Sequence, residues 1–195
     1  IGQDVLIECD PRLVPLYKRS YPGLNFLPRN REKTLNFPPG TDVRSLTSFD
    51  MAHVLRGDLA RFPAQRSAWL TPDPERVRAL SHKYREAWPG KRLVGLSWKS
   101  ARVMEGGETK NIDITDFAGL LSDRDSVFIN LQYGNISGDL AALRGAGLTL
   151  HVDDDIDPMQ DIDAFAAQVA ALDLVISTSN TTAHVAGALG VPCWL

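Results

Sequence analysis

The second half of the chain alternates short apolar runs with longer segments whose apolar residues recur every three to four positions. The short runs are typical of strands buried in a parallel sheet, and the longer segments of helices that cover such a sheet. The pattern predicts strands at 93–98, 127–132, 148–152 and just before Ile176, and helices at 74–88, 115–121, 139–146, 161–172 and 183–189. This alternation predicts an α/β fold, a Rossmann-like three-layer sandwich around a parallel sheet.

The first 73 residues show a weaker pattern. Residues 5–8, 12–20 and 25–27 predict a strand, a helix and a strand. Residues 28–73 hold five of the twelve prolines and only one possible short helix, at 51–61, which is typical of a linker. We therefore expect residues 1–73 to be the tail of a preceding α/β domain plus a linker. Residues 74–195 are then a second domain, which we expect to be truncated because the chain stops within a predicted strand.

Composition narrows the possible partners. Hydrophobic residues make up 44% of the chain and charged residues 23%, with a formal net charge of −3, so broad attraction to nucleic acid is not expected. No apolar run is long enough for a membrane span. Cys9 and Cys193 lie far apart in the sequence with no CxxC motif, which favours reduced thiols and a cytoplasmic protein.

Polar residues gather at the start of the stretch ISTSNTTAHVAGALGVPCWL at 176–195, in the turn between the strand predicted to end at Ile176 and the helix predicted at 183–189. Ligands of open α/β sheets bind at this edge, where the amino end of a helix presents unpaired N–H groups. Asn180 or Thr181 can cap the helix, while Thr182 and His184 can aim donors at phosphate oxygens. The alternative is that these side chains only cap the helix and satisfy the turn.

A second polar group follows the strand at 93–98. It comprises Ser97, Lys99 and Ser100, with Lys110 just before the next helix. Because the ends of parallel strands converge, the two lysines can neutralise a diphosphate at the same edge. The alternative is an ordinary solvated loop. Gln132 and Tyr133 end the next strand and can border a base or ribose, although Tyr133 is equally plausible as a packing residue.

From about Arg92 the sequence resembles the C-terminal domain of GT-B glycosyltransferases, in particular the family-9, heptosyltransferase-like type that often follows tetratricopeptide repeats in bacterial proteins. The matching segments are VGLSWKS at 94–100, FINLQYG at 128–134 and DIDAFAAQVAALDLVISTSNTTAHVAGALGVPCW at 161–194. IECDPRLVPLYKRSYPG, near the start, is similar to the closing strand and helix of such an enzyme's N-terminal domain. The resemblance implies two facing Rossmann-like domains, with a nucleotide-sugar held mainly by the second.

The resemblance also implies roles for individual residues. Hydroxyl and lysine side chains of the loop after the first strand contact the nucleotide phosphates in the family. From the residues themselves, Met159 and Ile162 can wall a base pocket through backbone and apolar contacts. One position departs from the family pattern: Ser179 stands where heptosyltransferases usually carry an Asp. The region that would supply a catalytic base lies outside this chain, so the catalytic residue is not assigned.

Four carboxylates follow the strand expected at 148–152, namely Asp153, Asp154, Asp155 and Asp157. Their spacing is similar to the DxD metal motif of the other major glycosyltransferase fold, and carboxylates suit Mg²⁺ or Mn²⁺. The GT-B resemblance implies metal-independent transfer instead. We therefore expect a solvated loop, no bound metal and no cofactor other than the nucleoside-diphosphate sugar.

These observations favour a glycosyltransferase that moves a sugar from a nucleoside diphosphate to an acceptor, which is a protein, a glycan or a lipid-linked molecule. One alternative is a non-catalytic domain that retains the fold for ligand or protein binding, which Ser179 slightly favours. A nucleotide-sugar epimerase of related architecture is another. Tetratricopeptide repeats elsewhere in the full-length protein are a further expectation.

Overall fold

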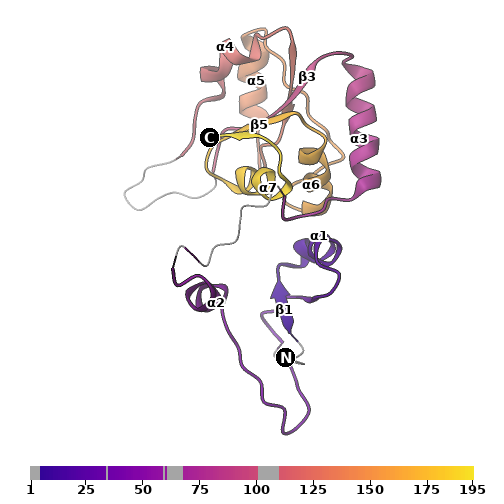
Figure 1. Cartoon of the computed structure of the whole chain (residues 1–195). Coiled ribbons are helices and arrows are strands. Elements are labelled where there is room, and N and C mark those ends of the chain that lie inside the picture. Colours follow the sequence, from indigo (N-terminus) through magenta and orange to yellow (C-terminus); the bar gives the residue numbers. More distant parts are fainter. Residues whose placement is uncertain (1–4, 34, 59, 61–67, 101–109) are drawn as a thin grey trace. The chain divides into compact units, whose positions relative to one another are not determined.

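The computed structural model describes residues 5–33, 35–58, 60, 68–100 and 110–195. The chain divides into two compact units, one formed by residues 1–28 together with 68–195 and the other by residues 29–67 (Figure 1). The sequence-based boundary between residues 73 and 74 concerns a preceding domain, and it stays a prediction.

The larger unit is built on a four-stranded sheet in which all neighbouring strands are parallel. Its strands are β3 (Arg92–Ser97), β4 (Ser126–Asn130), β5 (Leu174–Ser177) and β6 (Cys193–Trp194). Their spatial order is β4-β3-β5-β6, and Val94 of β3 pairs with Phe128 on one side and Leu174 on the other. The predicted α/β class with a parallel sheet is confirmed.

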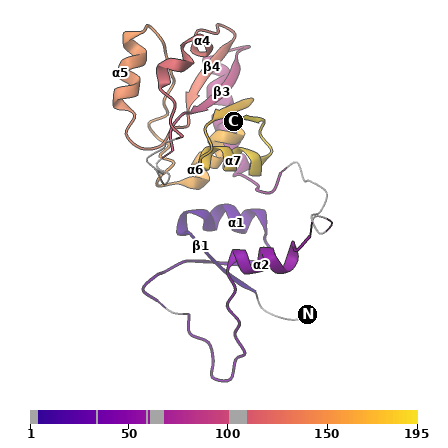
Figure 2. The same ribbon diagram turned by 90° about the vertical axis from the view of Figure 1, so that its left-hand side faces the viewer.

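Helices cover both faces of this sheet, as the side view shows (Figure 2). The helices on one face are α3 (Pro74–Ala87), α6 (Ile162–Ala170) and α7 (Thr181–Leu189); the other face carries the 3-10 turn η3 (Ile114–Phe117), α4 (Ala118–Leu121) and α5 (Ser137–Gly145). Each face has its own apolar core, because β3 sends Leu93 to one and Leu96 to the other. The predicted three layers are present.

The helices begin and end where local chemistry requires. Asp73 caps α3 by accepting hydrogen bonds from Glu75 N (2.9 Å) and Arg76 N (3.2 Å). Asn180 caps the start of α7, as predicted, and Gly190 caps its end in the left-handed conformation (φ 74°). The helices predicted at 74–88 and 183–189 agree with the observed bounds to within two residues.

The prediction of a strand at 148–152 is wrong. Only His151 joins the sheet, through one parallel bridge to Ile129, in which Asn130 N donates to His151 O (2.7 Å). Two residues later Asp153 is held by Lys83 and Tyr84 of α3. The chain therefore turns out of the ladder after a single residue.

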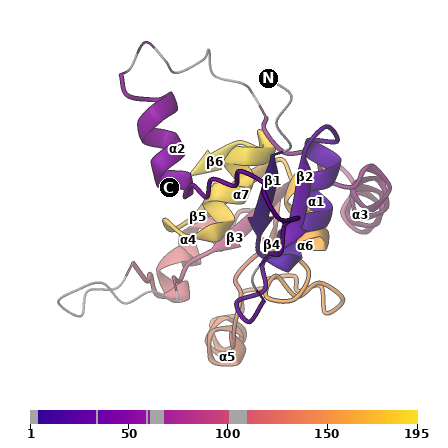
Figure 3. The same ribbon diagram turned by 90° about the horizontal axis from the view of Figure 1, so that it is seen from below.

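The N-terminal segment of the larger unit has the predicted β-α-β pattern. It consists of β1 (Leu6–Cys9), the 3-10 turn η1 (Pro11–Leu13), α1 (Val14–Ser20) and β2 (Asn25–Pro28), and the two strands form a parallel pair (Figure 3). Leu16 of α1 is fully buried in the core beside α6. Arg19 binds Asp163 of α6 through two hydrogen bonds of 2.8 and 2.7 Å, which attach this segment to the larger sheet domain.

The smaller unit contains one described helix, α2 (Ser48–Leu55). Thr47 and Asp50 form a capping box, so the helix begins three residues before the predicted start at Met51. Among the helices of both units, none in the described ranges combines the length and apolar character needed to cross a membrane.

Candidate functional site

The carboxyl ends of β3 and β5 define the main polar edge of the sheet. From β3 the chain proceeds to β4 on one side of it, and only later places β5 and β6 on the other side. The strand order therefore reverses between β3 and β5, which is the position where open α/β sheets bind ligands. The two strand ends are joined by a hydrogen bond from Thr178 N to Ser97 O (3.0 Å).

Asn180 organises the turn between β5 and α7. Its Oδ1 accepts hydrogen bonds from Thr182 N (2.9 Å) and Ser177 Oγ (3.0 Å). Its Nδ2 donates to Ser97 Oγ (2.8 Å) and to Lys99 O (3.0 Å). One buried amide thus caps α7 and ties it to the end of β3.

Gln132 plays the matching part at the end of β4. Its Oε1 accepts from Ser97 Oγ (3.1 Å), Trp98 N (2.9 Å) and Lys99 N (2.7 Å). The chain Asn180–Ser97–Gln132 therefore links three neighbouring strand ends through side chains that are all buried. A buried, satisfied network of this kind orders the surrounding loops.

The other side chains of the turn that were predicted to donate to a phosphate differ in exposure: some point into the protein and others face solvent. Thr182 is fully buried, and its hydroxyl donates to Leu131 O (3.4 Å), so in this structure it supports the turn and does not face solvent. Ser179, Thr181 and His184 are exposed. The turn therefore has an inner layer that holds its shape and an outer layer available to a ligand.

Backbone donors accompany the outer layer. Thr182 N is capped by Asn180, and His184 N donates to Asn180 O (3.4 Å). Thr181 N and Ala183 N find no acceptor among the residues that the structure describes. Unpaired N–H groups in the first turn of a helix favour an anion.

The two predicted lysines differ in their partners. Lys110 Nζ lies 3.3 Å from Ser179 Oγ, at the outer layer of the turn. Lys99 Nζ contacts both carboxylate oxygens of Asp139 in the first turn of α5, at 2.6 and 2.7 Å. Asp139 was not predicted as a site residue, because nothing in its spacing marks it as the partner of a residue forty positions earlier.

Three predicted site residues lie at the margins of this network. Ser100 N donates to Asn111 Oδ1 (2.8 Å), and Tyr133 O accepts from Gln132 Nε2 (3.1 Å). Met159 is half exposed, and its carbonyl accepts a hydrogen bond from Arg12 Nη1 (2.7 Å). Nucleotide contacts by these three residues stay predictions.

The acidic segment is not simply a solvated loop, as the sequence analysis expected. Asp154, Asp155 and Asp157 are exposed, but the Asp153 side chain is only 1% exposed. Lys83, Tyr84 and Gln168 donate hydrogen bonds to its carboxylate. Burial raises the pKa of Asp153, but the bonds from Lys83 and Tyr84 outweigh burial and leave the pKa below its ordinary value.

Asp153 therefore joins α3 to α6 through its hydrogen bonds to Lys83, Tyr84 and Gln168. Within the described ranges, no group of three or more His, Cys, Asp or Glu side chains is arranged to hold a metal ion.

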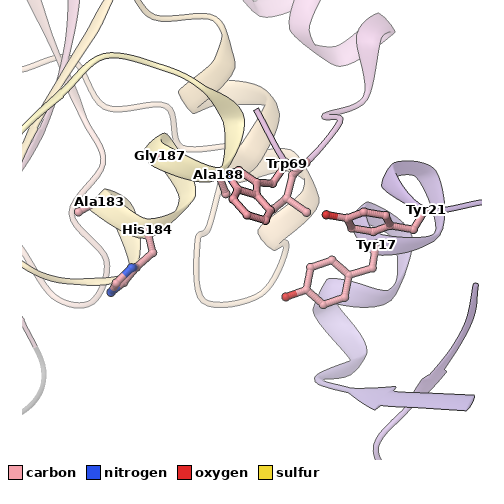
Figure 4. A pocket seen from close by; sticks show the side chains of 8 residues that line it. Tyr17, Tyr21, Trp69, Ala183, His184, Gly187 and Ala188 are labelled. Carbon is pink, nitrogen blue, oxygen red and sulfur yellow. The ribbon is translucent and has the colours of Figure 1, made fainter. Parts of the chain in front are cut away.

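An aromatic cavity of about 530 Å³ adjoins the turn. It is lined by Tyr17 of α1 and Tyr21 directly after that helix, by Trp69 and Leu70, and by Ala183, His184, Gly187 and Ala188 of α7 (Figure 4). We call this space the aromatic cavity. The aromatic cavity was not predicted, because its walls come from three segments far apart in the chain, and Trp69 stands in a stretch without periodicity.

A known protein is similar to this chain along almost its whole length. Protein FlbA of Caulobacter vibrioides is 31% identical over 202 residues, which cover 97% of this chain and 33% of FlbA. The chain thus spans about a third of the length of that relative, whose name specifies neither an activity nor a ligand. None of the family models compared with the chain matches it.

Among solved structures, the chain is similar to E. coli ADP-heptose LPS heptosyltransferase II, with a TM-score of 0.43 and 15% identity over 69% of this chain and 41% of that one. A similarity this distant establishes neither a common fold nor a function. The α/β class therefore depends on the strand order and pairing described above.

Proposed function

We propose that the turn between β5 and α7 binds the diphosphate of a nucleoside-diphosphate sugar, and that the chain is the donor-binding part of a glycosyltransferase. The observation that carries the proposal is the two-layered turn at the sheet's switch point. Its inner layer is locked by Asn180, and its outer layer presents Ser179 and Thr181 with the unpaired N–H groups of Thr181 and Ala183. The sequence resemblance to GT-B donor domains supports the same function.

The chemistry required of this turn is stabilisation of a leaving group. As the sugar moves to the acceptor, its bond to the diphosphate breaks and negative charge grows on the phosphate oxygens. Backbone donors and a lysine aimed at that charge lower the barrier without reorganising. Lys110 is already at the turn, whereas Lys99 must leave Asp139 to take part.

In this proposal, residues 74–195 hold the donor, and no metal or cofactor takes part. The acceptor is a protein, a glycan or a lipid-linked molecule, and the protein acts in the cytoplasm. The catalytic base comes from a region outside this chain, in keeping with a chain that spans only a third of its relative.

Calorimetric titration of the purified protein with UDP, GDP, ADP and CMP tests the proposal. We expect one nucleoside diphosphate to bind, and Lys110→Ala to weaken it by roughly tenfold at low salt and less at high salt, because the charge is exposed and screened. Lys91→Ala is the matched control, since it removes the same charge at the opposite end of β3. Equal affinities for both variants would contradict the site.

A non-catalytic binding domain is the second candidate. Ser179 favours it, because the carboxylate that heptosyltransferases usually carry there is absent. Binding of a nucleotide-sugar without transfer or epimerisation, measured with the full-length protein, would support this candidate over an enzyme.

A further inference from the structure

The aromatic cavity is open and preformed. Trp69 N and Leu70 N both donate to Ala188 O, at 2.7 and 2.9 Å, and these bonds hold the indole against α7. On the opposite wall stand Tyr17 of α1 and Tyr21, the C-cap residue that follows α1, and both rings pack on Phe26, with centroid separations of 5.4 and 6.4 Å. Figure 4 shows the two tyrosines reaching toward Trp69, with His184 at the other end of the lining.

Small residues keep the space empty on the α7 side. A Cβ atom added at Gly187 would meet no other atom within 4 Å, so the helix surface there faces free volume. Ala183 and Ala188 flank it along the same wall. A ligand can therefore approach the helix backbone closely.

The lining selects an uncharged, ring-shaped ligand with polar edges. None of its eight residues is Asp, Glu, Lys or Arg, so a charged group gains no partner there. Three aromatic rings offer flat apolar surfaces, while the hydroxyls of Tyr17 and Tyr21 and the imidazole of His184 offer hydrogen bonds. A sugar ring has this combination of apolar faces and hydroxyl edges. The volume lies within the roughly 300–1,000 Å³ of small-molecule sites.

The position of the aromatic cavity beside the start of α7 indicates which sugar it binds. Ala183 and His184 belong both to the cavity wall and to the first turn of α7, where the diphosphate is proposed to bind. The sugar is bonded to the terminal phosphate, so its ring must lie next to the turn that binds the diphosphate. We propose that the aromatic cavity holds the sugar ring of the nucleoside-diphosphate sugar, an inference that rests on the proposed function.

Filling the cavity from α7 tests this. Gly187→Leu projects a side chain into the free volume, and leucine favours a helix more than glycine, so the fold is retained. Gly119→Leu is the matched control, because Gly119 is an exposed helical glycine of α4 with equally free surroundings. The probes are UDP with UDP-glucose, GDP with GDP-mannose and ADP with ADP-glucose, titrated by calorimetry.

For the pair that binds, we expect Gly187→Leu to weaken the sugar nucleotide by about tenfold or more and the free diphosphate by less than about twofold. Gly119→Leu should change neither. Tyr21→Phe keeps the ring but removes one hydroxyl, and should weaken only the sugar nucleotide.

The outcomes separate the two proposals. If Gly187→Leu weakens the free diphosphate as much as the sugar nucleotide, the base or ribose occupies the cavity and the sugar assignment is wrong. If it weakens neither, while Lys110→Ala weakens both, the diphosphate site stands and the cavity proposal fails. If no probe binds the wild-type protein, both proposals fail.

Discussion

Removing the Asn180 side chain is the sharpest test of how the turn between β5 and α7 is built. Asn180→Ala deletes the cap on α7, since Thr182 N loses its acceptor at 2.9 Å. It also deletes the donor that joins α7 to Ser97 Oγ and Lys99 O. The substitution therefore breaks a local and a long-range connection at once.

The expected loss follows from these contacts. An N-cap contributes about 1 kcal/mol, and each buried polar group left without a partner costs about 1–3 kcal/mol. Ser97 Oγ still has Gln132 as a partner, and Lys99 O can turn to water, so the bridging bonds contribute near the lower limit. We expect the free energy of unfolding to fall by about 2–4 kcal/mol.

Urea denaturation followed by circular dichroism measures this loss. Asn180→Ser keeps a good capping side chain but is too short to reach Ser97, so it should recover only the cap, about 1 kcal/mol. Asn135→Ala is the control, because Asn135 accepts from Ser137 N in an exposed turn and its loss should cost less than about 1 kcal/mol. The reasoning is refuted if Asn180→Ala is no more destabilising than Asn135→Ala.

Three further substitutions probe other parts of the larger unit. Asp139→Asn frees the Lys99 amino group, so nucleoside-diphosphate affinity measured by calorimetry should rise by roughly two- to tenfold; unchanged or weaker binding would contradict this. The pKa of Asp153 in the folded protein lies below its ordinary value, so this carboxylate stabilises the fold above about pH 4, and the contribution is lost as the pH falls through the folded-state pKa. Denaturation between pH 7 and 2 should show this loss in the wild type but not in Asp153→Asn, and parallel pH profiles would exclude the role. Gly95→Ala drives a Cβ atom into the buried side chains of Leu131 and Leu172, and should lower the free energy of unfolding, measured by urea denaturation, by about 1–3 kcal/mol; an unchanged free energy would show that the two leucines can move aside.

Much of the fold was predictable because its signals are local. Apolar runs mark β3, β4 and β5, and capping residues such as Asp73 and Asn180 mark helix starts within a few positions. The strand at 148–152 failed for the opposite reason: its apolar pattern is adequate, but Asp153 is drawn out of the ladder by α3, some seventy residues earlier in the chain. Tertiary contacts of that kind leave no trace in the local pattern.

The candidate site shows the same division. The sequence placed Ser97, Gln132 and Asn180 at one edge, because parallel strand ends converge, and the structure joins them by hydrogen bonds. The sequence pattern does not show which hydroxyls point into the core. Thr182 was therefore predicted to contact a phosphate, although its side chain is buried. The pairing of Lys99 with Asp139 also depends on where α5 packs.

A crystal structure with the tightest-binding nucleoside diphosphate tests the central claim most directly. We predict that its phosphate oxygens lie within hydrogen-bonding distance of Thr181 N and Ala183 N, with Lys110 alongside. A diphosphate bound instead at the opposite edge of the sheet, beside Lys91 and Arg92, would contradict the account.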